Sequence, residues 1–382
     1  MDGDIRQRSE TFEMWTFHNP VRICFGEGSL RQLAQALDQR RYLLVTYGEP
    51  YFAALVDRIS NQAGPPVAVV DEIKPNPDFS HFKQLCGQLA DLASQVEVIV
   101  ALGGGSVIDA AKVLSASLND FALVEDFLLT GRGEERFDFH PIIAIPTTAG
   151  TGSEVTSWAT VWDSQSSKKY SLSHPRLLPE LALVDPELMA DLPMQLTIST
   201  GLDALSHSLE SIWNKNANPL STDLAVAAAR GVLSTLPRLT EEPGSLALRN
   251  RMAKAALTAG MAFSNTKTAL AHSLSYPITL EHGLPHGLAC SFSLPMIMAG
   301  VIGQDAETDE ALRRIFGEDL DQAVLDLAAF LEKLGVPISP AKHGIPREDF
   351  RALIASAFQG ERGRNFIGRE DRVLAAEARL TG

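Results

Sequence analysis

An aspartate and three histidines are spaced in a way that suits a divalent metal ion. Asp203 and His207 are four residues apart, so on a helix they lie on one face and can converge on one point. His272 and His286 stand beside small residues later in the chain. Three imidazoles and one carboxylate suit Fe or Zn and do not suit Mg or Ca. The alternative for Asp203 and His207 is a salt-bridged helix face, which the two later histidines disfavour.

A glycine-rich loop could hold the pyrophosphate of a dinucleotide. Residues 102–112, LGGGSVIDAAK, follow a predicted strand and open a predicted helix. Glycines let backbone N–H groups approach a phosphate, and the start of a helix favours negative charge. The alternative is a tight turn in which Ser106 caps the helix. The polar loop 146–154, PTTAGTGSE, could line the same cleft, and a metal beside a nucleotide predicts redox chemistry on a carbonyl.

Length and composition limit the class of protein. The 382 residues are 45% hydrophobic and 21% charged, which is typical of a globular enzyme with two domains. The net charge of −14 argues against nucleic acid as a partner. There is no apolar run of about 18 residues and no apolar N-terminal stretch, so neither a membrane span nor a signal peptide is predicted. Three cysteines without a C-x-x-C pair favour reduced thiols in the cytoplasm over disulfides or a cysteine metal site.

The first half of the chain alternates β-rich runs with helical stretches, which predicts a doubly wound, Rossmann-like parallel sheet. Residues 15–25 read as one or two extended strands that could pair with a second subunit in a homodimer. From about residue 193 onward the pattern is amphipathic and helical. We therefore predict an α/β nucleotide-binding domain over residues 1–190 and an all-α metal-binding domain over residues 191–382. The predicted strands are 41–46, 66–70, 96–102 and 141–145, and the predicted helices are 29–39, 109–118, 221–236, 246–262, 306–316 and 320–334.

Four motifs in register resemble the iron-containing (group III) alcohol dehydrogenase family. They are G-G-G-S-x-x-D-x-A-K, P-T-T-x-G-T-G-S-E, G-x-D-A-x-x-H-x-x-E and a late H…P-H-G. The resemblance implies the dehydroquinate synthase-like fold, with Fe(II) or Zn(II) in the cleft between two domains. It implies the metal ligands Asp203, His207, His272 and His286. It implies an NAD(P)H site at Gly103, Gly104, Gly105, Ser106, Thr147, Thr148, Asn76 and Lys169.

Two departures from the family pattern bear on the substrate. Tyr276 replaces a histidine often assigned to proton relay, and Lys267 replaces a glycine close to the metal ligands. A cation there favours an anionic substrate, and this stretch is most similar to the phosphonoacetaldehyde reductase subgroup. The alternative is that Lys267 extends to solvent from a surface helix. Tyr276, His282 or a water-linked ribose hydroxyl are the candidate proton donors.

The predicted function is metal-dependent, NAD(P)H-linked reduction of a small aldehyde to a primary alcohol. Phosphonoacetaldehyde, giving 2-hydroxyethylphosphonate, is the favoured substrate, with Tyr276, His282 and Lys267 as catalytic residues. The alternatives are a general short-chain alcohol or glycerol dehydrogenase and a lyase similar to dehydroquinate synthase. The choice between NAD and NADP stays open, because Tyr47 stands where NAD-selective members often place an aspartate.

Overall fold

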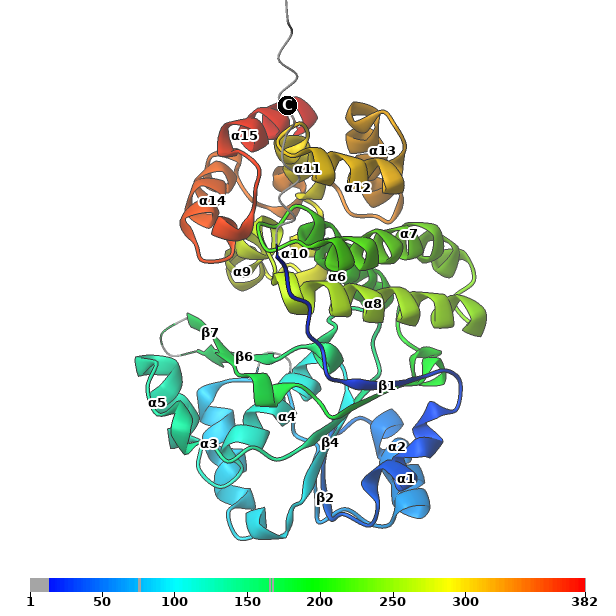
Figure 1. Cartoon of the computed structure of the whole chain (residues 1–382), viewed down its shortest axis with the longest axis vertical. Helices are drawn as coiled ribbons and strands as arrows, with labels where there is room; N and C mark the ends of the chain where they lie inside the picture. Colours follow the sequence, from blue (N-terminus) through cyan, green and yellow to red (C-terminus); the bar gives the residue numbers. More distant parts are fainter. Residues whose placement is uncertain (1–13, 75–76, 165, 167, 382) are drawn as a thin grey trace, which may run out of the picture.

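The computed structural model describes residues 14–74, 77–164, 166 and 168–381, and Figure 1 shows two stacked parts. We call residues 14–193 the sheet half and residues 194–381 the helical half. Asn76, predicted at the cofactor site, lies outside the described residues.

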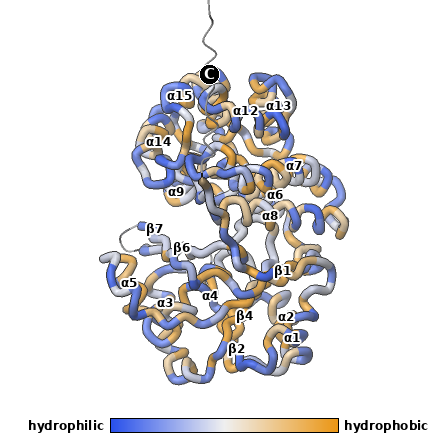
Figure 2. The backbone as a smooth tube through the Cα atoms, in the orientation of Figure 1, coloured by the Kyte–Doolittle hydropathy of each residue, from blue (hydrophilic) through white to orange (hydrophobic). Residues whose placement is uncertain are grey.

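The sheet half is built on six parallel strands in the order β1-β8-β5-β4-β2-β3. Near-continuous Val, Ile and Leu runs form the inner strands, which are buried on both faces as expected for a covered parallel sheet. Figure 2 shows this hydrophobic colour along β2 and β4. The strands are β1 (Arg22–Phe25), β2 (Tyr42–Val45), β3 (Ala68–Val70), β4 (Val98–Gly103), β5 (Ile142–Pro146) and β8 (Leu181–Val184).

Helices cover both faces of the sheet because alternate strand residues point to opposite sides. Leu43 and Val45 pack with α3, α4 and α5, whereas Tyr42 and Leu44 pack with α1 and α2. The sheet is therefore doubly wound, as predicted. These helices are α1 (Leu33–Leu37), α2 (Pro50–Ala63), α3 (Phe79–Leu89), α4 (Gly105–Ser117) and α5 (Ala122–Thr130).

Two features of the sheet half differ from the sequence prediction. Of residues 15–25 only Arg22–Phe25 forms a strand, and it pairs in parallel with β8 of its own chain. The predicted strands also omitted β8 and the antiparallel hairpin of β6 (Trp158–Asp163) and β7 (Lys168–Ser173). The short, half-polar sequence of β7, KKYSLS, carries little of the apolar pattern that marks a strand.

Beyond Val184 the described residues form helices and no further strand. Their core packs on Val155, Ala182 and Val184 of the sheet half, so apolar contacts join the two halves. The predicted fold class is confirmed. No helix among the described residues has the length and apolar character needed to cross a membrane. The helices are α6 (Met194–Ile212), α7 (Pro219–Glu241), α8 (Leu246–Thr266), α9 (Leu270–His282), α10 (His286–Ser291), α11 (Leu294–Val301), α12 (Ala306–Phe316), α13 (Leu320–Lys333), α14 (Arg347–Gln359) and α15 (Glu370–Thr381).

Candidate metal and nucleotide site

A cleft of about 1260 Å³ lies between the two halves. The glycine loop, the 146–154 loop and the β6–β7 hairpin line it from the sheet half, and α6, α8, α9 and α10 line it from the helical half. Large clefts at the carboxyl ends of parallel strands are where open α/β folds bind ligands.

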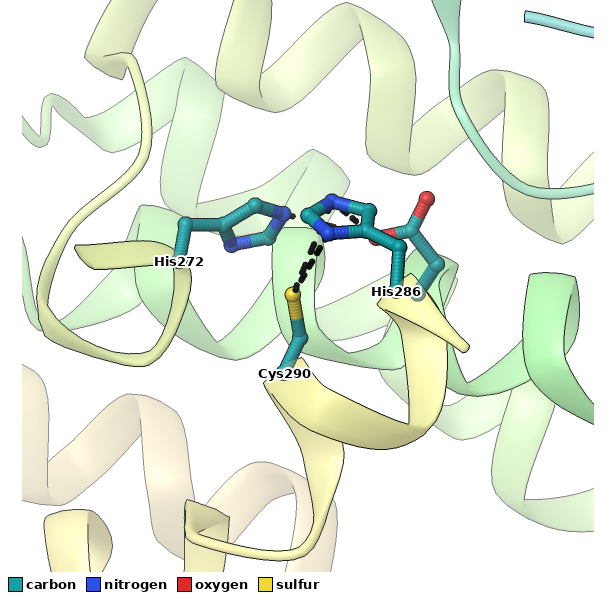
Figure 3. Close-up of side chains that lie close together, drawn as sticks. His272, His286 and Cys290 are labelled. Atoms are coloured by element: carbon teal, nitrogen blue, oxygen red, sulfur yellow. Dashed lines mark hydrogen bonds and ion pairs between the residues drawn. The ribbon is translucent and has the colours of Figure 1, made fainter. Parts of the chain in front are cut away.

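The four predicted metal ligands meet in one part of this cleft, which we call the metal end. The Nε2 atoms of His207, His272 and His286 lie 3.7, 3.4 and 3.9 Å from Oδ1 of Asp203. Helix α6 presents Asp203 and His207 one turn apart, while α9 and α10 bring the other two histidines. Figure 3 shows the rings of His272 and His286 directed toward one another.

The side chains fit a bound cation. Among the described residues, Oδ1 of Asp203 and Nε2 of His272 are buried without a hydrogen-bond partner. Such atoms are rare in folded proteins because leaving a buried polar atom unpaired costs free energy. Burial lowers the pKa of His207 to about 4, which keeps its imidazole neutral and able to coordinate. Burial raises the pKa of Asp203, but the neighbouring imidazoles outweigh burial and hold it below its ordinary value.

The glycine loop lines the cleft from the sheet half, and we call this part the nucleotide end. β4 ends at Gly103, and α4 begins at Gly105 with Gly104 at its N-cap. Gly104, Gly105 and Ser106 line the cleft, as do Thr147 and Thr148. Gly103 does not line the cleft: a Cβ atom there would lie 2.6 Å from the side chain of Val107, so this glycine permits the strand-to-helix packing.

Comparison with known proteins agrees with this geometry. The family model described as "Iron-containing alcohol dehydrogenase" matches residues 20–186, and the model of the family's C-terminal part matches residues 197–370. The chain belongs to the iron-containing alcohol dehydrogenase family. The predicted family and enzyme class are thereby confirmed.

Several relatives of this dehydrogenase align over most of their length. The NAD-dependent methanol dehydrogenase of Bacillus methanolicus is 29% identical, with 91% of this chain and 94% of the relative covered. The 1-propanol dehydrogenase PduQ of Salmonella typhimurium is 33% identical, with 75% and 73% covered. The structure of sulfoacetaldehyde reductase from Bifidobacterium kashiwanohense in complex with NAD+ has a TM-score of 0.87 at 29% identity, with 97% and 99% covered.

Glu210 of this dehydrogenase was absent from the predicted site residues. Its Oε2 atom lies 2.5 Å from Nδ1 of His272, and its Oε1 atom accepts the backbone N–H of Ala271 at 2.5 Å. A carboxylate on one imidazole nitrogen fixes the ring orientation and leaves the other nitrogen for a metal. The signal was present in the sequence, since Asp203, His207 and Glu210 follow one face of α6.

Cys290 also lies beside the metal ligands, contrary to the prediction of no cysteine at a metal site. Its Sγ atom is 3.7 Å from Nε2 of His286, one turn away on α10 (Figure 3). Ligand atoms of Asp203, His272, His286 and Cys290 all lie within 4.8 Å of one another, a grouping that leaves out His207. The ring of His207 instead stacks on Phe263, with ring centres 3.9 Å apart. Burial raises the pKa of the Cys290 thiol, which favours its neutral form.

The remaining predicted residues divide between the cleft and its surroundings. Tyr276, Lys169 and Lys267 line the cleft, whereas His282 does not. The Lys169 amine lies 3.6 Å from the ring centre of Tyr276, one turn beyond His272 on α9. Lys169 therefore lines the cleft near the metal ligands, and its contact with the cofactor stays a prediction.

Proposed function

We propose that this dehydrogenase reduces a small anionic aldehyde to the primary alcohol with NAD(P)H, and that phosphonoacetaldehyde is its substrate. The supporting observation is the exposed side chain of Lys267, which lines the cleft that also holds the metal ligands. Among the described residues no carboxylate forms an ion pair with Lys267. A free ammonium group there is suited to hold an acidic substituent of the substrate. The relative named sulfoacetaldehyde reductase has a substrate of this anionic class.

The metal and the cofactor would be held by different residues. Asp203, His207, His272 and His286 would hold Fe(II) or Zn(II), and the glycine loop would hold the pyrophosphate of the cofactor. When bound, the metal polarises the carbonyl group and the reduced nicotinamide supplies a hydride.

Tyr276 is the favoured donor of the proton that the alcohol product requires. It lines the cleft, and its ring stacks on His286 with centres 6.0 Å apart. Burial raises the pKa of the Tyr276 hydroxyl, but the cations Lys169 and Arg362 outweigh burial and hold the pKa below its ordinary value. A lowered pKa makes a phenol a better proton donor near neutral pH.

A general short-chain alcohol dehydrogenase is the second candidate, because relatives carry names such as 1-propanol dehydrogenase and 1,3-propanediol dehydrogenase. Membership of the iron-containing alcohol dehydrogenase family argues against the alternative of a lyase similar to dehydroquinate synthase, which would show no net consumption of NADH. The homodimer, the cytoplasmic location and the use of NADP stay predictions.

The test is a substrate panel on protein loaded with Fe(II) or Zn(II), with NADH and with NADPH. We expect phosphonoacetaldehyde to have a higher kcat/KM than sulfoacetaldehyde and propanal. Lys267→Ala should lower kcat/KM for phosphonoacetaldehyde roughly ten- to hundredfold, the worth of one charge-assisted contact, with a smaller loss for propanal.

Lys254→Ala is the matched control, since Lys254 is an exposed lysine on α8 that does not line the cleft. Equal losses on phosphonoacetaldehyde and propanal in Lys267→Ala would make Lys267 structural. A wild-type enzyme without preference for the anionic aldehydes would refute the proposed substrate.

A further inference from the structure

Two cations from opposite halves of the molecule pack on one tyrosine ring at the metal end of the cleft. The Lys169 amine, from β7, lies 3.6 Å from the ring centre of Tyr276. The guanidinium carbon of Arg362, from the loop after α14, lies 4.9 Å from the same ring centre. Both side chains are half-buried and line the cleft. Figure 1 shows the β6–β7 hairpin below α9 and α14, so the pair spans the cleft.

Neither cation is neutralised by the protein. Among the described residues no carboxylate forms an ion pair with Lys169 or Arg362, although Glu361 also lines the cleft. Arg362 donates from Nε to Oγ1 of Thr268 at 3.2 Å. The carboxylate that acts electrostatically on Lys169 is Asp109. It already accepts hydrogen bonds from the Ser153 hydroxyl and from the backbone N–H of Thr160.

Two partly desolvated positive charges without counter-charges are unfavourable until an anion binds. Their ring contacts with Tyr276 supply some stabilisation but leave the charges in place. The positive charge of Lys169 and Arg362 is a local feature of the cleft, since the chain as a whole carries a net charge of −14. The arrangement is therefore that of a binding site for an anion.

We propose that Lys169 and Arg362 form an anion clamp that, together with Lys267, holds the phosphonate group of the substrate while its aldehyde faces the metal ligands. Arg362 donates to Thr268, the residue that follows Lys267, so the three cations line the same part of the cleft. A guanidinium group binds two oxygens of a tetrahedral anion at once, and two cations match the two charges of a phosphonate better than the single charge of a sulfonate.

The position of the clamp fixes the kind of substrate. Tyr276 follows His272 by one turn and stacks on His286, so the two cations lie next to the metal ligands. An acidic group bound there belongs to a short aldehyde that carries it on the adjacent carbon. This inference rests on the proposed function for its substrate, but the binding of an anion at these two residues can be measured without any turnover.

The experiment measures the dissociation constant of ethylphosphonate, an unreactive probe, by calorimetry on the metal- and cofactor-loaded enzyme. Arg362→Gln and Lys169→Gln should each weaken binding at least tenfold, and Arg362→Lys should weaken it less than Arg362→Gln. The matched controls Arg364→Gln and Lys168→Gln, exposed neighbours that do not line the cleft, should bind as the wild type does. Metal content and cofactor affinity of each variant verify that the site is still assembled.

The outcomes separate the clamp from the proposed function. Unchanged ethylphosphonate binding in Arg362→Gln and Lys169→Gln would overturn the clamp, even if the wild type prefers phosphonoacetaldehyde. Lost binding in both variants would support the clamp, even if the wild type reduces propanal equally well and the proposed substrate fails. Ethanesulfonate that binds as tightly as ethylphosphonate would overturn the assignment to a doubly charged group.

Discussion

The two ends of the cleft are built in different ways. The nucleotide end consists of two contiguous loops that follow β4 and β5, and its expected phosphate contacts are backbone N–H groups at the start of α4. The metal end consists of side chains from α6, α9 and α10, which only tertiary packing brings together. Local chain geometry therefore suffices to form the first, whereas the second depends on the whole helical half.

The electrostatics differ in the same way. Gly103, Gly104, Gly105 and Ser106 carry no charged side chain, and the positive end of the α4 dipole acts in place of one. The metal end concentrates charged side chains. Asp203, with its unpaired Oδ1, and Glu210, on His272, are buried, and the half-buried cations Lys169 and Arg362 pack on Tyr276. A substitution at one end should therefore leave ligand binding at the other end unchanged.

The largest effect is expected from His286→Ala, which breaks only the metal end. Its side chain is 40% exposed, so truncation should cost the fold little. Loss of an outer partner of a ligand typically costs ten- to hundredfold in metal affinity, and loss of a ligand should cost more than about a hundredfold. Metal content and turnover should fall together, while NADH binding, measured by fluorescence, should persist.

His282→Ala is the control for His286→Ala, because this neighbouring histidine does not line the cleft. Its activity should match the wild type. A strong loss of turnover in His282→Ala with metal retained would instead restore His282 as the proton donor and argue against Tyr276.

A smaller effect is expected from Gly104→Val, which breaks only the nucleotide end. The backbone angles of Gly104 are open to any residue. Its added Cβ would lie 3.3 Å from the Thr148 methyl group, a tight contact that a small movement of the Thr148 side chain relieves. The side chain should block the phosphates and weaken NADH binding roughly ten- to hundredfold. Metal content should not change. Gly87→Val, on exposed α3 with open space around it, is the control.

Unchanged NADH affinity in Gly104→Val would place the phosphates elsewhere. Simultaneous loss of metal in Gly104→Val would show that metal binding and cofactor binding depend on one another.

The difference between the ends explains what sequence reasoning could predict. The glycine loop and the inner strands were found because short contiguous patterns encode them. The four candidate metal ligands could be chosen from the sequence because few residue types coordinate iron or zinc, and two of them share one helical face. The three histidines lie within 3.9 Å of Oδ1 of Asp203, and coordination of a metal by the four residues stays a prediction.

The errors concern residues that act through tertiary contacts. Arg362 was not predicted at all, because nothing in the sequence near residue 362 indicates that its loop packs on α9. Lys169 was predicted near the cofactor and lines the cleft, but its packing on Tyr276 was not predicted. Gly103 was predicted to touch the cofactor, yet it serves the packing of Val107. β1 pairs with β8 at the edge of its own sheet, and its pairing with a second subunit stays a prediction.

The smallest predicted effect tests whether the metal end is strained for function. Lys267 has φ +63 and ψ 179, a backbone region that essentially only glycine occupies without strain. Its N–H donates to the Phe263 carbonyl at 2.8 Å, and its carbonyl accepts from Asn214 at 3.2 Å, so neighbours hold this conformation. Strain of this kind destabilises the folded state by about 1–3 kcal/mol, and a glycine at this position would relieve it. Glycine also gives the unfolded chain more conformational freedom, which offsets about 0.5–1 kcal/mol of the stabilisation.

Lys267→Gly should therefore stabilise the protein by about 1 kcal/mol, seen as a rise in Tm of about 1 °C, while lowering the preference for phosphonoacetaldehyde. Lys267→Ala removes the same amine but keeps a side chain in the strained conformation, so it should lose the preference without the gain in Tm. The two variants separate the effect of the lost charge from the effect of backbone strain, because only Lys267→Gly relieves the strain. An equal Tm in the two variants would show that the backbone at Lys267 is not strained, and the metal end would then resemble the nucleotide end in its freedom from stored strain.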